Sequence, residues 1–201
     1  MIQTAGVTGL ILCGGAGARL GGRDKPLELL GGVPLVEHVR ERLHPQVARI
    51  LISCNRKFGE YGRWNDTIVQ DEGSNLGPLG GILAGLRLTD TDRLFVCPGD
   101  APFLSTTLID RLTAALDRDA DIALPRDGIR RQHLFSLMRR SLESPLADYL
   151  QSGGRSMYSF VEQQRTVVID VSSERDAFFN VNSPGDLRAA EAILRRSGPH
   201  R

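Results

Sequence analysis

Residues 10–26 read LILCGGAGARLGGRDKP, an apolar strand that continues into a glycine-rich loop and ends with Asp-Lys-Pro. Glycine tolerates positive φ, so such a loop can turn successive backbone N–H groups toward one point and form a cradle for an anion. Arg19 and Lys25 add full positive charge to that cradle. We therefore predict that this segment binds a polyphosphate. The alternative is a glycine-rich turn between a strand and a helix that binds no ligand.

The spacing within this loop excludes two common phosphate-binding motifs. A P-loop requires Ser or Thr directly after Gly-Lys, but here Asp24 precedes Lys25 and Pro26 follows it. The dinucleotide-binding fingerprint requires a third Gly or Ala at the start of a helix. In residues 15–20 that position holds Leu20, so the match is one residue short. The predicted phosphate site is therefore expected to be of another type.

The composition of the 201-residue chain is that of an ordinary globular protein. Hydrophobic residues make up 41% of it, which is enough for a substantial core. The 25 basic and 24 acidic residues nearly cancel, and the net charge of +1 gives no broad footprint for nucleic acid or membranes. The arginines are scattered without interleaved aromatic residues, and no apolar run approaches the ~18 residues of a membrane span. Any electrostatic function must therefore be local.

The three cysteines, Cys13, Cys54 and Cys97, are an odd number without Cys-x-x-Cys spacing. That pattern argues against a disulfide framework or a structural zinc site. The first residues lack the basic start and long apolar core of a signal peptide. We expect a reduced, cytoplasmic enzyme in which Cys13 is a candidate exposed thiol of the glycine loop.

Apolar strand-like runs alternate with helical patterns along most of the chain, which is typical of βαβ units around a mainly parallel sheet. The sequence predicts a three-layer α/β/α, Rossmann-like fold with a mostly parallel, mixed sheet. We expect one domain over residues 1–201, with residues 197–201 frayed. The predicted strands lie at 9–13, 50–52, 67–70, 94–97, 122–124, 134–137 and 166–171. The predicted helices lie at 34–43, 79–88, 142–150, 156–162 and from 184 onward, and a further helix, capped by Ser105 or Thr106, reaches Leu116.

Two of these helices have informative sequences at their starts. Residues 183–186, Ser-Pro-Gly-Asp, predict an N-cap, a proline at the first helical position and the acid of a capping box. Gly80, Gly81 and Gly85 lie inside the predicted helix 79–88, where each costs about 1 kcal/mol relative to Ala. Either this helix packs closely on the sheet, or its start approaches a ligand through the backbone, and the two explanations are compatible.

Polar groups gather where the predicted strands end. Ligands of open α/β sheets bind outside the carboxyl ends of parallel strands. The glycine loop, residues 53–56, Asp71 and Asp100 all fall at such ends. Asp100 follows an apolar strand inside the rigid turn Pro-Gly-Asp-Ala-Pro. A carboxylate fixed there suits Mg²⁺, which prefers carboxylate and phosphate oxygens. The alternative is an Asp that caps a turn or helix.

The loop resembles the nucleotide-binding loop of the nucleotidyltransferases related to sugar-1-phosphate pyrophosphorylases. More narrowly, nearly the whole chain is similar to the molybdenum cofactor guanylyltransferases, the MobA family. The similarity includes GGVPLV at 31–36, GPLGG at 77–81, CPGDAPF at 97–103 and FNVNSP at 179–184. The resemblance implies the nucleotide-diphospho-sugar transferase type of fold. It also implies transfer of GMP from GTP to the terminal phosphate of Mo-molybdopterin, with release of pyrophosphate.

The resemblance implies roles for individual residues. Arg19 and Lys25 neutralise the phosphates, and Asp100 binds Mg²⁺ at the α-phosphate; these three are the predicted catalytic residues. Because the attacking phosphate is already an anion, catalysis requires positioning and charge neutralisation but no general base. Ser53 departs from the family pattern, in which Asn can stand at that position. The predicted nucleotide-binding residues, besides Lys25 and Asp100, are Leu12, Cys13, Gly14, Gly15, Asn55, Asp71, Pro78 and Leu79.

Four residues are candidates for binding the acceptor substrate, Mo-molybdopterin. Asn180 and Asn182 match the family's Asn-Val-Asn pair, which implies contact with the pterin phosphate or the metal; the alternative is turn and cap chemistry. Arg155 is a candidate for the acceptor phosphate or a solvated surface arginine. His133 falls in a His-Pro region of relatives, where Leu134 replaces the proline, and a structural role is the alternative. The implied partners are GTP, Mo-molybdopterin and transient cofactor-handling proteins.

Two other functions are the alternatives, of which the first would keep the loop, Lys25 and Asp100, whereas these residues argue against the second. A cytidylyltransferase for the same cofactor, or another small-molecule nucleotidyltransferase, would differ in the base pocket and the acceptor. A non-catalytic nucleotide-binding regulatory module would have no need of a metal-binding carboxylate beside the α-phosphate.

Overall fold

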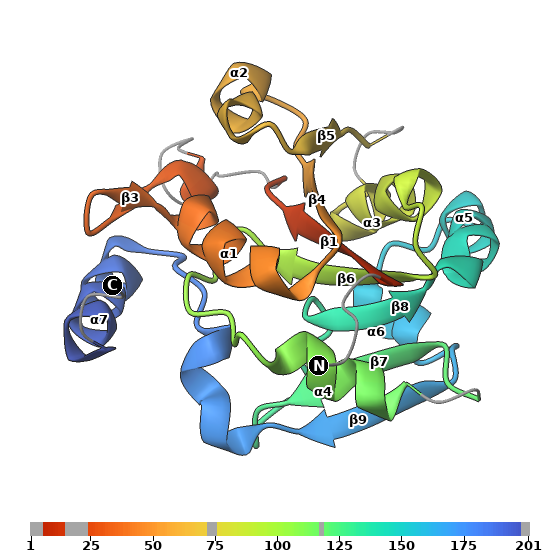
Figure 1. The fold of residues 1–201 in the computed structure, drawn as a ribbon. Coiled ribbons are helices and arrows are strands. Elements are labelled where there is room, and N and C mark those ends of the chain that lie inside the picture. Colours follow the sequence, from red (N-terminus) through yellow and green to blue (C-terminus); the bar gives the residue numbers. More distant parts are fainter. Residues whose placement is uncertain (1–5, 15–23, 72–75, 117–118, 198–201) are drawn as a thin grey trace.

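A seven-stranded mixed sheet forms the centre of the molecule, with strand order β5-β4-β1-β6-β8-β7-β9 (Figure 1). The structure is a computed structural model, which describes residues 6–14, 24–71, 76–116 and 119–197. Strand β8 runs antiparallel to β6 and β7, and the other neighbours are parallel. The predicted mixed, mostly parallel sheet is confirmed. The strands of this sheet are β1 (Val7–Leu12), β4 (Arg49–Ser53), β5 (Thr67–Val69), β6 (Arg93–Pro98), β7 (Ile122–Arg126), β8 (Ser136–Arg139) and β9 (Thr166–Asp170).

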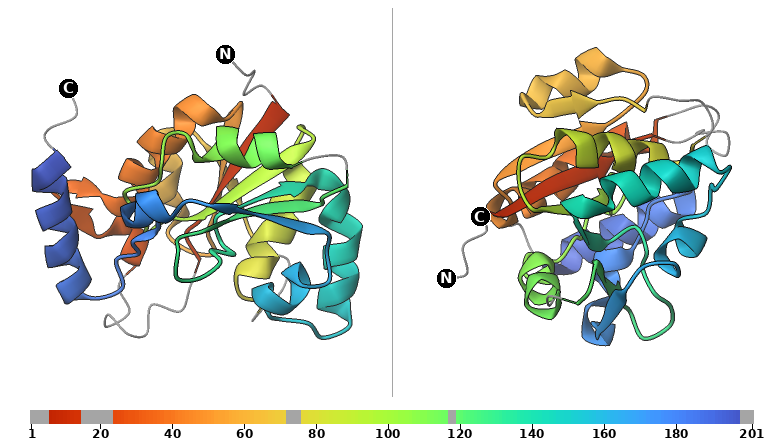
Figure 2. Two further views of the ribbon diagram at one scale, coloured as in Figure 1. Left: turned by 90° about the horizontal axis from the view of Figure 1, so that it is seen from below. Right: turned by 90° about the vertical axis from the view of Figure 1, so that its right-hand side faces the viewer.

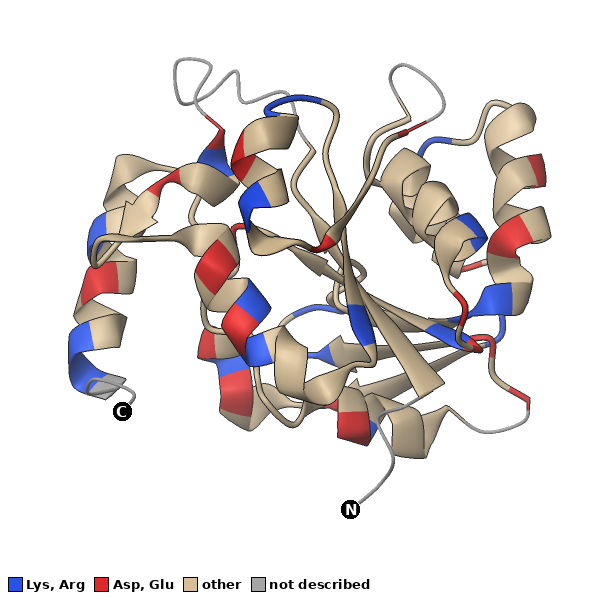
Figure 3. Cartoon of the chain, turned by 45° about the horizontal axis from the view of Figure 1, so that its top comes forward, with Lys and Arg blue, Asp and Glu red and all other residues tan. Residues whose placement is uncertain are grey.

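Helices cover both faces of this sheet, as the views of Figure 2 show. The α-helices are α1 (Leu35–Leu43), α2 (Phe58–Tyr61), α3 (Pro78–Leu88), α4 (Leu108–Ala115), α5 (Glu143–Gln151), α6 (Met157–Val161) and α7 (Pro184–Ser197). Short 3₁₀ helices connect them: η3 (Lys25–Leu27), η4 (His44–Gln46), η5 (Gly62–Trp64), η6 (Arg140–Leu142) and η7 (Ser172–Phe178). Acidic and basic residues are both spread over the chain (Figure 3), in keeping with the balanced charge.

Two apolar layers fill the space between the sheet and its helices. Successive side chains of a strand point to opposite faces, and β1 supplies both layers in this way. Ile11 packs in the layer under α1 and α4, whereas Leu10 and Leu12 pack in the layer under α3 and α5. Because both faces are covered, the central strands are apolar throughout, and the sequence shows them as continuous apolar runs.

A third, smaller apolar cluster attaches α7 to the rest of the fold. Strands β2 (Leu29–Leu30) and β3 (Val33–Pro34) form a hairpin whose two-residue turn uses Gly31 and Gly32, with φ of 59° and 86°. The cluster buries Leu30 of this hairpin with Ala190 of α7 and with Val181, which precedes α7. The cluster thereby fixes the segment that immediately precedes α7.

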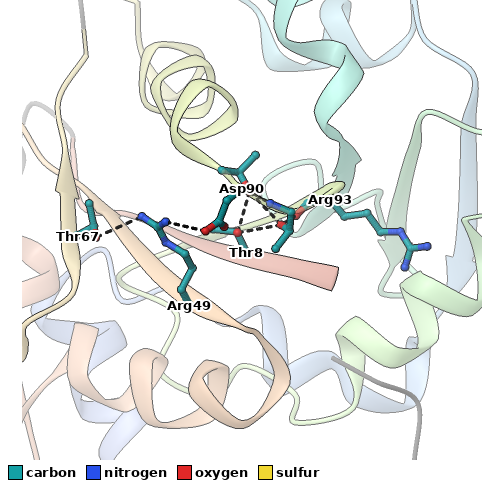
Figure 4. A network of polar contacts seen from close by, with 7 residues as sticks. Thr8, Arg49, Thr67, Asp90 and Arg93 are labelled. Atoms are coloured by element: carbon teal, nitrogen blue, oxygen red, sulfur yellow. Dashed lines mark hydrogen bonds and ion pairs between the residues drawn. The ribbon is translucent and has the colours of Figure 1, made fainter. Parts of the chain in front are cut away.

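Threonine hydroxyls join α3, β1 and β6 at the amino ends of the strands (Figure 4). The Thr89 hydroxyl donates to Thr8 Oγ1 at 2.7 Å, and the Thr91 hydroxyl donates to the Arg93 carbonyl at 2.8 Å. Beside them, Arg49 donates to the Asp90 carboxylate at 3.2 Å. This network joins the amino ends of the central strands to the end of α3.

Three local predictions need correction. The strand predicted at 134–137 lies at Ser136–Arg139, because the Phe135 amide donates to the Gln132 carbonyl and closes a turn before it. The helix predicted to be capped by Ser105 or Thr106 begins at Leu108 with Thr107 as its N-cap, because Ser105 Oγ accepts a bond from the Thr107 backbone amide in a preceding turn. Cys13 is buried rather than exposed, and burial raises the pKa of its thiol well above the usual range.

Candidate functional site

A pocket of about 290 Å³ opens at the carboxyl ends of β1 and β6. It is bounded by the end of β1, the start of η3, the start of α3, the turn after β6 and the segment before α7. The location agrees with the expectation for an open α/β sheet. Its lining residues are Leu12, Cys13, Gly14, Asp24, Lys25, Pro26, Arg56, Pro78, Pro98, Asp100, Leu134, Asn180 and Asn182.

Backbone hydrogen bonds from two neighbouring segments fix Asp100 at this pocket. The Gly99 amide donates to the Leu12 carbonyl at 2.9 Å, and the Val181 amide donates to the Asp100 carbonyl at 2.9 Å. A Cβ at position 99 would lie 2.7 Å from Cys13 Sγ, so only glycine permits this approach of the turn to the end of β1. The rigid turn predicted around Asp100 is therefore joined to both the end of β1 and the Asn-Val-Asn segment.

The Asp100 carboxyl group experiences two opposing influences. Burial raises its pKa above the usual range, and the positive charge of Lys25 acts in the opposite direction. The net shift is upward. A carboxylate in this position gains from a second positive charge, and a bound cation supplies one.

Lys25 is held by the capping structure of α7. Its ammonium group donates to Asn182 Oδ1 at 2.8 Å. The backbone N–H of Asn182 in turn donates to Asp186 Oδ2 at 3.0 Å, and the backbone N–H of Asp186 donates to Ser183 Oγ at 3.1 Å. The predicted capping box is confirmed, and it holds the side chain of Asn182 toward the pocket.

The donor set at Asp100 fits a magnesium ion. Asn180 lines the same pocket, and its Oδ1 is buried without a hydrogen-bond partner. A buried amide oxygen normally finds a partner, and a hard cation is one that an acceptor-only group can take. In the part of the chain that the structure describes, no cluster of three or more His, Cys, Asp or Glu side chains could hold a metal. Mg²⁺ does not require such a cluster, since it binds through one or two carboxylates, water and substrate phosphates.

Asn55 and Asp71 form a pair at the ends of β4 and β5. The Asn55 amide group donates to Asp71 Oδ2 at 3.0 Å, and the Asp71 backbone amide donates to Asn55 Oδ1 at 3.0 Å. Neither residue lines the pocket of about 290 Å³. The pair lies against the start of α3, because a Cβ at Gly80 would be 3.0 Å from Asp71 Cγ.

The other predicted nucleotide-binding residues divide into three groups. Leu12, Cys13, Gly14 and Pro78 line the pocket as expected. Leu79 is fully buried in the apolar layer under α3, so only its backbone is suited to contact a ligand. Gly15 and Arg19 lie outside the described residues.

A second, wider pocket of about 700 Å³ adjoins the first and shares Pro78, Leu134 and Asn180 with it. His133 lies on its wall with its ring edge against Tyr158, at 5.5 Å between centroids. Burial lowers the pKa of His133, and its Nε2 is buried without a hydrogen-bond partner. Arg130, Arg131 and Glu162 also line this pocket, and Arg131 donates to Glu162 at 2.6 Å. The pocket therefore offers an aromatic surface and charges of both signs.

Arg155 lies apart from these candidates. Its guanidinium donates to the carbonyl oxygens of Leu150 at 2.8 Å and Gly154 at 2.6 Å, where it closes the end of α5. It is not among the residues that line either pocket. The structure therefore gives Arg155 a contact with the backbone, and its role toward an acceptor stays a prediction.

Sequence reasoning missed two charged residues of the pocket, Asp24 and Arg56. Asp24 stands in the quoted loop directly before Lys25, and Arg56 ends the polar segment after β4. Their positions were visible in the sequence, but their proximity was not. They meet because α2, a four-residue helix, follows Arg56 and places the Tyr61 hydroxyl on Asp24.

Comparisons with known proteins agree with this geometry. Residues 9–167 match the MobA-like NTP transferase domain family. The chain is 38% identical over 184 residues to a molybdenum cofactor guanylyltransferase of Shewanella halifaxensis, with 90% of this chain and 92% of the relative covered. It is 39% identical over 199 residues to the one of Ralstonia nicotianae, with 94% and 97% covered.

Solved structures show the same fold. The molybdopterin-guanine dinucleotide biosynthesis protein A of Archaeoglobus fulgidus superposes with a TM-score of 0.79 at 25% identity, covering 94% of this chain and 99% of that one. The 2-C-methyl-D-erythritol 4-phosphate cytidylyltransferase of Thermus thermophilus superposes with a TM-score of 0.71 at 16% identity, covering 92% and 98%. The second likeness concerns the fold alone.

Proposed function

The chain belongs to the MobA-like NTP transferase family, and on that premise we propose that it transfers GMP from GTP to Mo-molybdopterin. Its relatives are guanylyltransferases by name, and the enzyme class is therefore nucleotidyltransferase. The products of the proposed reaction are the guanine dinucleotide form of the cofactor and pyrophosphate.

One observation carries the proposal: a buried carboxylate and a lysine share a pocket at the carboxyl ends of the central strands. Asp100 and Lys25 both line it, and the charge of Lys25 acts on the Asp100 carboxyl group. A triphosphate needs positive charge along its length, and a lysine beside a metal-binding carboxylate supplies that charge from two directions. Regulatory binding of a nucleotide has no need of this arrangement at the reacting phosphate.

Asp100 and the Asn180 amide oxygen are the residues that would hold Mg²⁺. When bound, the ion supplies positive charge that neutralises phosphate oxygens in the reaction. Lys25 neutralises charge on the phosphate chain and on the departing pyrophosphate. Asn182 orients the Lys25 ammonium group through their hydrogen bond of 2.8 Å. Arg19, in the same loop sequence, is proposed to act with Lys25.

The reaction is a displacement at the α-phosphorus of GTP. An oxygen of the terminal phosphate of Mo-molybdopterin forms a new bond to that phosphorus. The bond from the α-phosphorus to the bridging oxygen breaks, and its electron pair leaves with pyrophosphate. The attacking group is already an anion, so the protein has no proton to remove. Its contribution is to position the two substrates and to neutralise their charge.

The second pocket is the proposed place of the acceptor. It shares Asn180 with the first pocket, so a molecule bound in it would reach the reacting phosphate. Arg130 and Arg131 on its wall suit the acceptor phosphate, and the edge-on pair His133–Tyr158 suits a flat pterin ring. We keep Arg155 as a weaker candidate, because it contacts backbone carbonyls.

The nucleoside part of GTP is proposed to lie toward the start of α3. Pro78 and the Leu79 backbone stand there, and the Asn55–Asp71 pair lies beside them. The proposed setting is the cytoplasm, with transient contact to proteins that deliver or receive the cofactor. In the described residues, no helix is long and apolar enough to cross a membrane.

The test incubates the protein with Mo-molybdopterin and either Mg²⁺–GTP or Mg²⁺–CTP, and measures pyrophosphate together with the dinucleotide product. We expect pyrophosphate release with GTP in preference to CTP, and formation of the guanine dinucleotide. Equal or faster turnover with CTP would instead identify a cytidylyltransferase. Binding of GTP without pyrophosphate release would identify a regulatory module.

A further inference from the structure

The proposed reaction assigns no role to Asp24, a buried acidic residue of the pocket. The Asp24 side chain is only 3% exposed, yet Asp24 belongs to the pocket wall. Its Oδ1 accepts a hydrogen bond from the Tyr61 hydroxyl at 2.9 Å. Its Oδ2 is buried without a hydrogen-bond partner and lies 3.7 Å from Nε of Arg56. A carboxylate this deeply buried costs free energy unless it is paired, so its retention calls for an explanation.

Tyr61 holds this carboxylate from the side away from the pocket. Its side chain is fully buried in the layer under α1, and it does not line the pocket. Burial raises the pKa of its hydroxyl, so the group stays protonated and donates. The hydroxyl therefore fixes one oxygen of Asp24 and leaves the other directed to the guanidinium of Arg56.

Arg56, unlike Tyr61, is partly exposed and faces the pocket. It lines the pocket, and its side chain is 47% exposed. A guanidinium carries five N–H donors in a planar fork, more than one carboxylate can engage. The fork matches the oxygens of a phosphate better than a single lysine ammonium does. An arginine that is anchored on one side by a buried acid is thereby oriented at little cost in side-chain entropy.

We propose that Arg56 binds the phosphate chain of the nucleotide, and that Asp24, itself held by Tyr61, positions Arg56 for that contact. This rests on the proposed function, because it takes the pocket to hold a nucleoside triphosphate. Arg56 is then a binding residue, while Asp24 and Tyr61 are positioning residues that act through it. The phosphates are favoured over the base because Lys25, which serves them, lines the same pocket and is the chain neighbour of Asp24.

The first test measures the Kd of Mg²⁺–GTP and of guanosine for the wild type and for Arg56→Gln by calorimetry. A lost charged hydrogen bond should weaken GTP binding by about tenfold or more, and leave guanosine binding unchanged. Arg63→Gln is the matched control: Arg63 is 48% exposed, stacks over Trp64 and does not line the pocket. It should change the GTP Kd by less than about twofold. Arg56→Lys should restore part of the loss, since it keeps the charge without the fork.

The second test asks whether Asp24 and Tyr61 act through Arg56. Asp24→Asn and Tyr61→Phe should each weaken GTP binding in the wild-type background and have no further effect in the Arg56→Gln background. Tyr149→Phe is the control for loss of a tyrosine hydroxyl, since Tyr149 donates to the Ser156 carbonyl away from the pocket. Equal losses of affinity in both backgrounds would overturn the positioning role, because they would indicate a general effect on the fold.

The outcomes separate this inference from the proposed function. If the wild type binds GTP and Arg56→Gln binds it equally well, Arg56 is not a phosphate ligand, and the proposed function stands. If Arg56→Gln weakens guanosine binding as much as GTP binding, Arg56 contacts the nucleoside and the inference is wrong. If the wild type binds no nucleoside triphosphate, both fail together.

Discussion

The ammonium group of Lys25 donates a 2.8 Å hydrogen bond to Asn182, although 157 residues separate them in the chain. This contact joins the loop after β1 to the capping structure of α7 across the pocket. Asp100 belongs to the same junction, because its carbonyl accepts from the Val181 amide at 2.9 Å. Three distant segments thereby hold one lysine and one carboxylate at a single pocket.

Removal of the Asp100 charge should separate activity from stability. Asp100→Asn should lower the rate of pyrophosphate release by about 100-fold or more, by analogy with the loss of one preorganised electrostatic contact. Because burial raises the pKa of Asp100, its charge is unfavourable in the fold, and the melting temperature of the variant should stay equal or rise. Asp110→Asn, at an exposed position of α4, is the control and should keep wild-type turnover. Wild-type turnover in Asp100→Asn would place the metal elsewhere.

Lys25 should contribute to both binding and rate. Lys25→Met should raise the Kd for GTP and lower the maximal rate, because the ammonium group neutralises the phosphates in the ground state and in the transition state. The chain contains one other lysine, Lys57, which lies 3.6 Å from Glu60 outside the pocket, so Lys57→Met is a matched control. The comparison requires steady-state kinetics and a binding measurement. Unchanged kinetics in Lys25→Met would remove this residue from the site.

Asp127 should contribute to the free energy of unfolding by an amount that depends on pH. Its Oδ1 accepts from the amides of Ile129 and Arg130, each at 2.8 Å, and its Oδ2 accepts from Gln132 at 2.7 Å. Burial alone would raise its pKa, but these hydrogen bonds outweigh burial, and the net shift is downward. Asp127→Ala should cost about 1–3 kcal/mol of unfolding free energy at neutral pH.

The pH profile follows from the direction of this shift. A carboxyl group with a lowered pKa in the folded state stabilises the fold above its unfolded pKa, about 4, and loses that contribution as pH falls through the folded value. The difference between wild type and Asp127→Ala should therefore shrink in urea titrations at progressively lower pH. A difference that grows toward acid would contradict the assigned hydrogen bonds.

The glycines of α3 should prove to be packing residues. A Cβ at Gly81 would lie 2.3 Å from Ser53 Oγ and 3.1 Å from Leu12 Cδ2. Gly81→Ala should therefore lower the unfolding free energy by about 1–2 kcal/mol, despite a gain of about 1 kcal/mol in helix propensity. Gly59→Ala in α2 is the control, since no heavy atom lies within 4 Å of its Cβ, and it should be neutral or stabilising. Equal effects of the two substitutions would contradict the close packing of α3 on the sheet.

Much of the fold could be predicted from the sequence, because the central strands are buried on both faces. The apolar runs around Leu10, Ile52 and Phe95 predicted the central strands β1, β4 and β6. The polar residues that follow β1 and β6 identified Lys25 and Asp100 as candidates for the site. The Ser-Pro-Gly-Asp segment gave the start of α7 through its cap chemistry. These features are local, so periodicity and spacing report them.

What could not be predicted depends on contacts between distant segments. Helix α2 has four residues, Phe58–Tyr61, which are too few to show a periodicity, so the Tyr61–Asp24 bond left no signal. The burial of Cys13 follows from the approach of Gly99, 86 positions later in the chain. The reversed direction of β8 depends on how the chain turns back after β7 and enters the sheet between β6 and β7, which the sequence of the strand does not encode.

The most direct measurement is a crystal structure of the protein with GTP and Mn²⁺, in which the metal is located by its anomalous signal. We predict one metal peak at the Asp100 carboxylate, with the triphosphate of the same GTP molecule in contact with that metal and with Lys25. A metal bound away from Asp100, or a triphosphate that does not reach Lys25, would contradict this prediction.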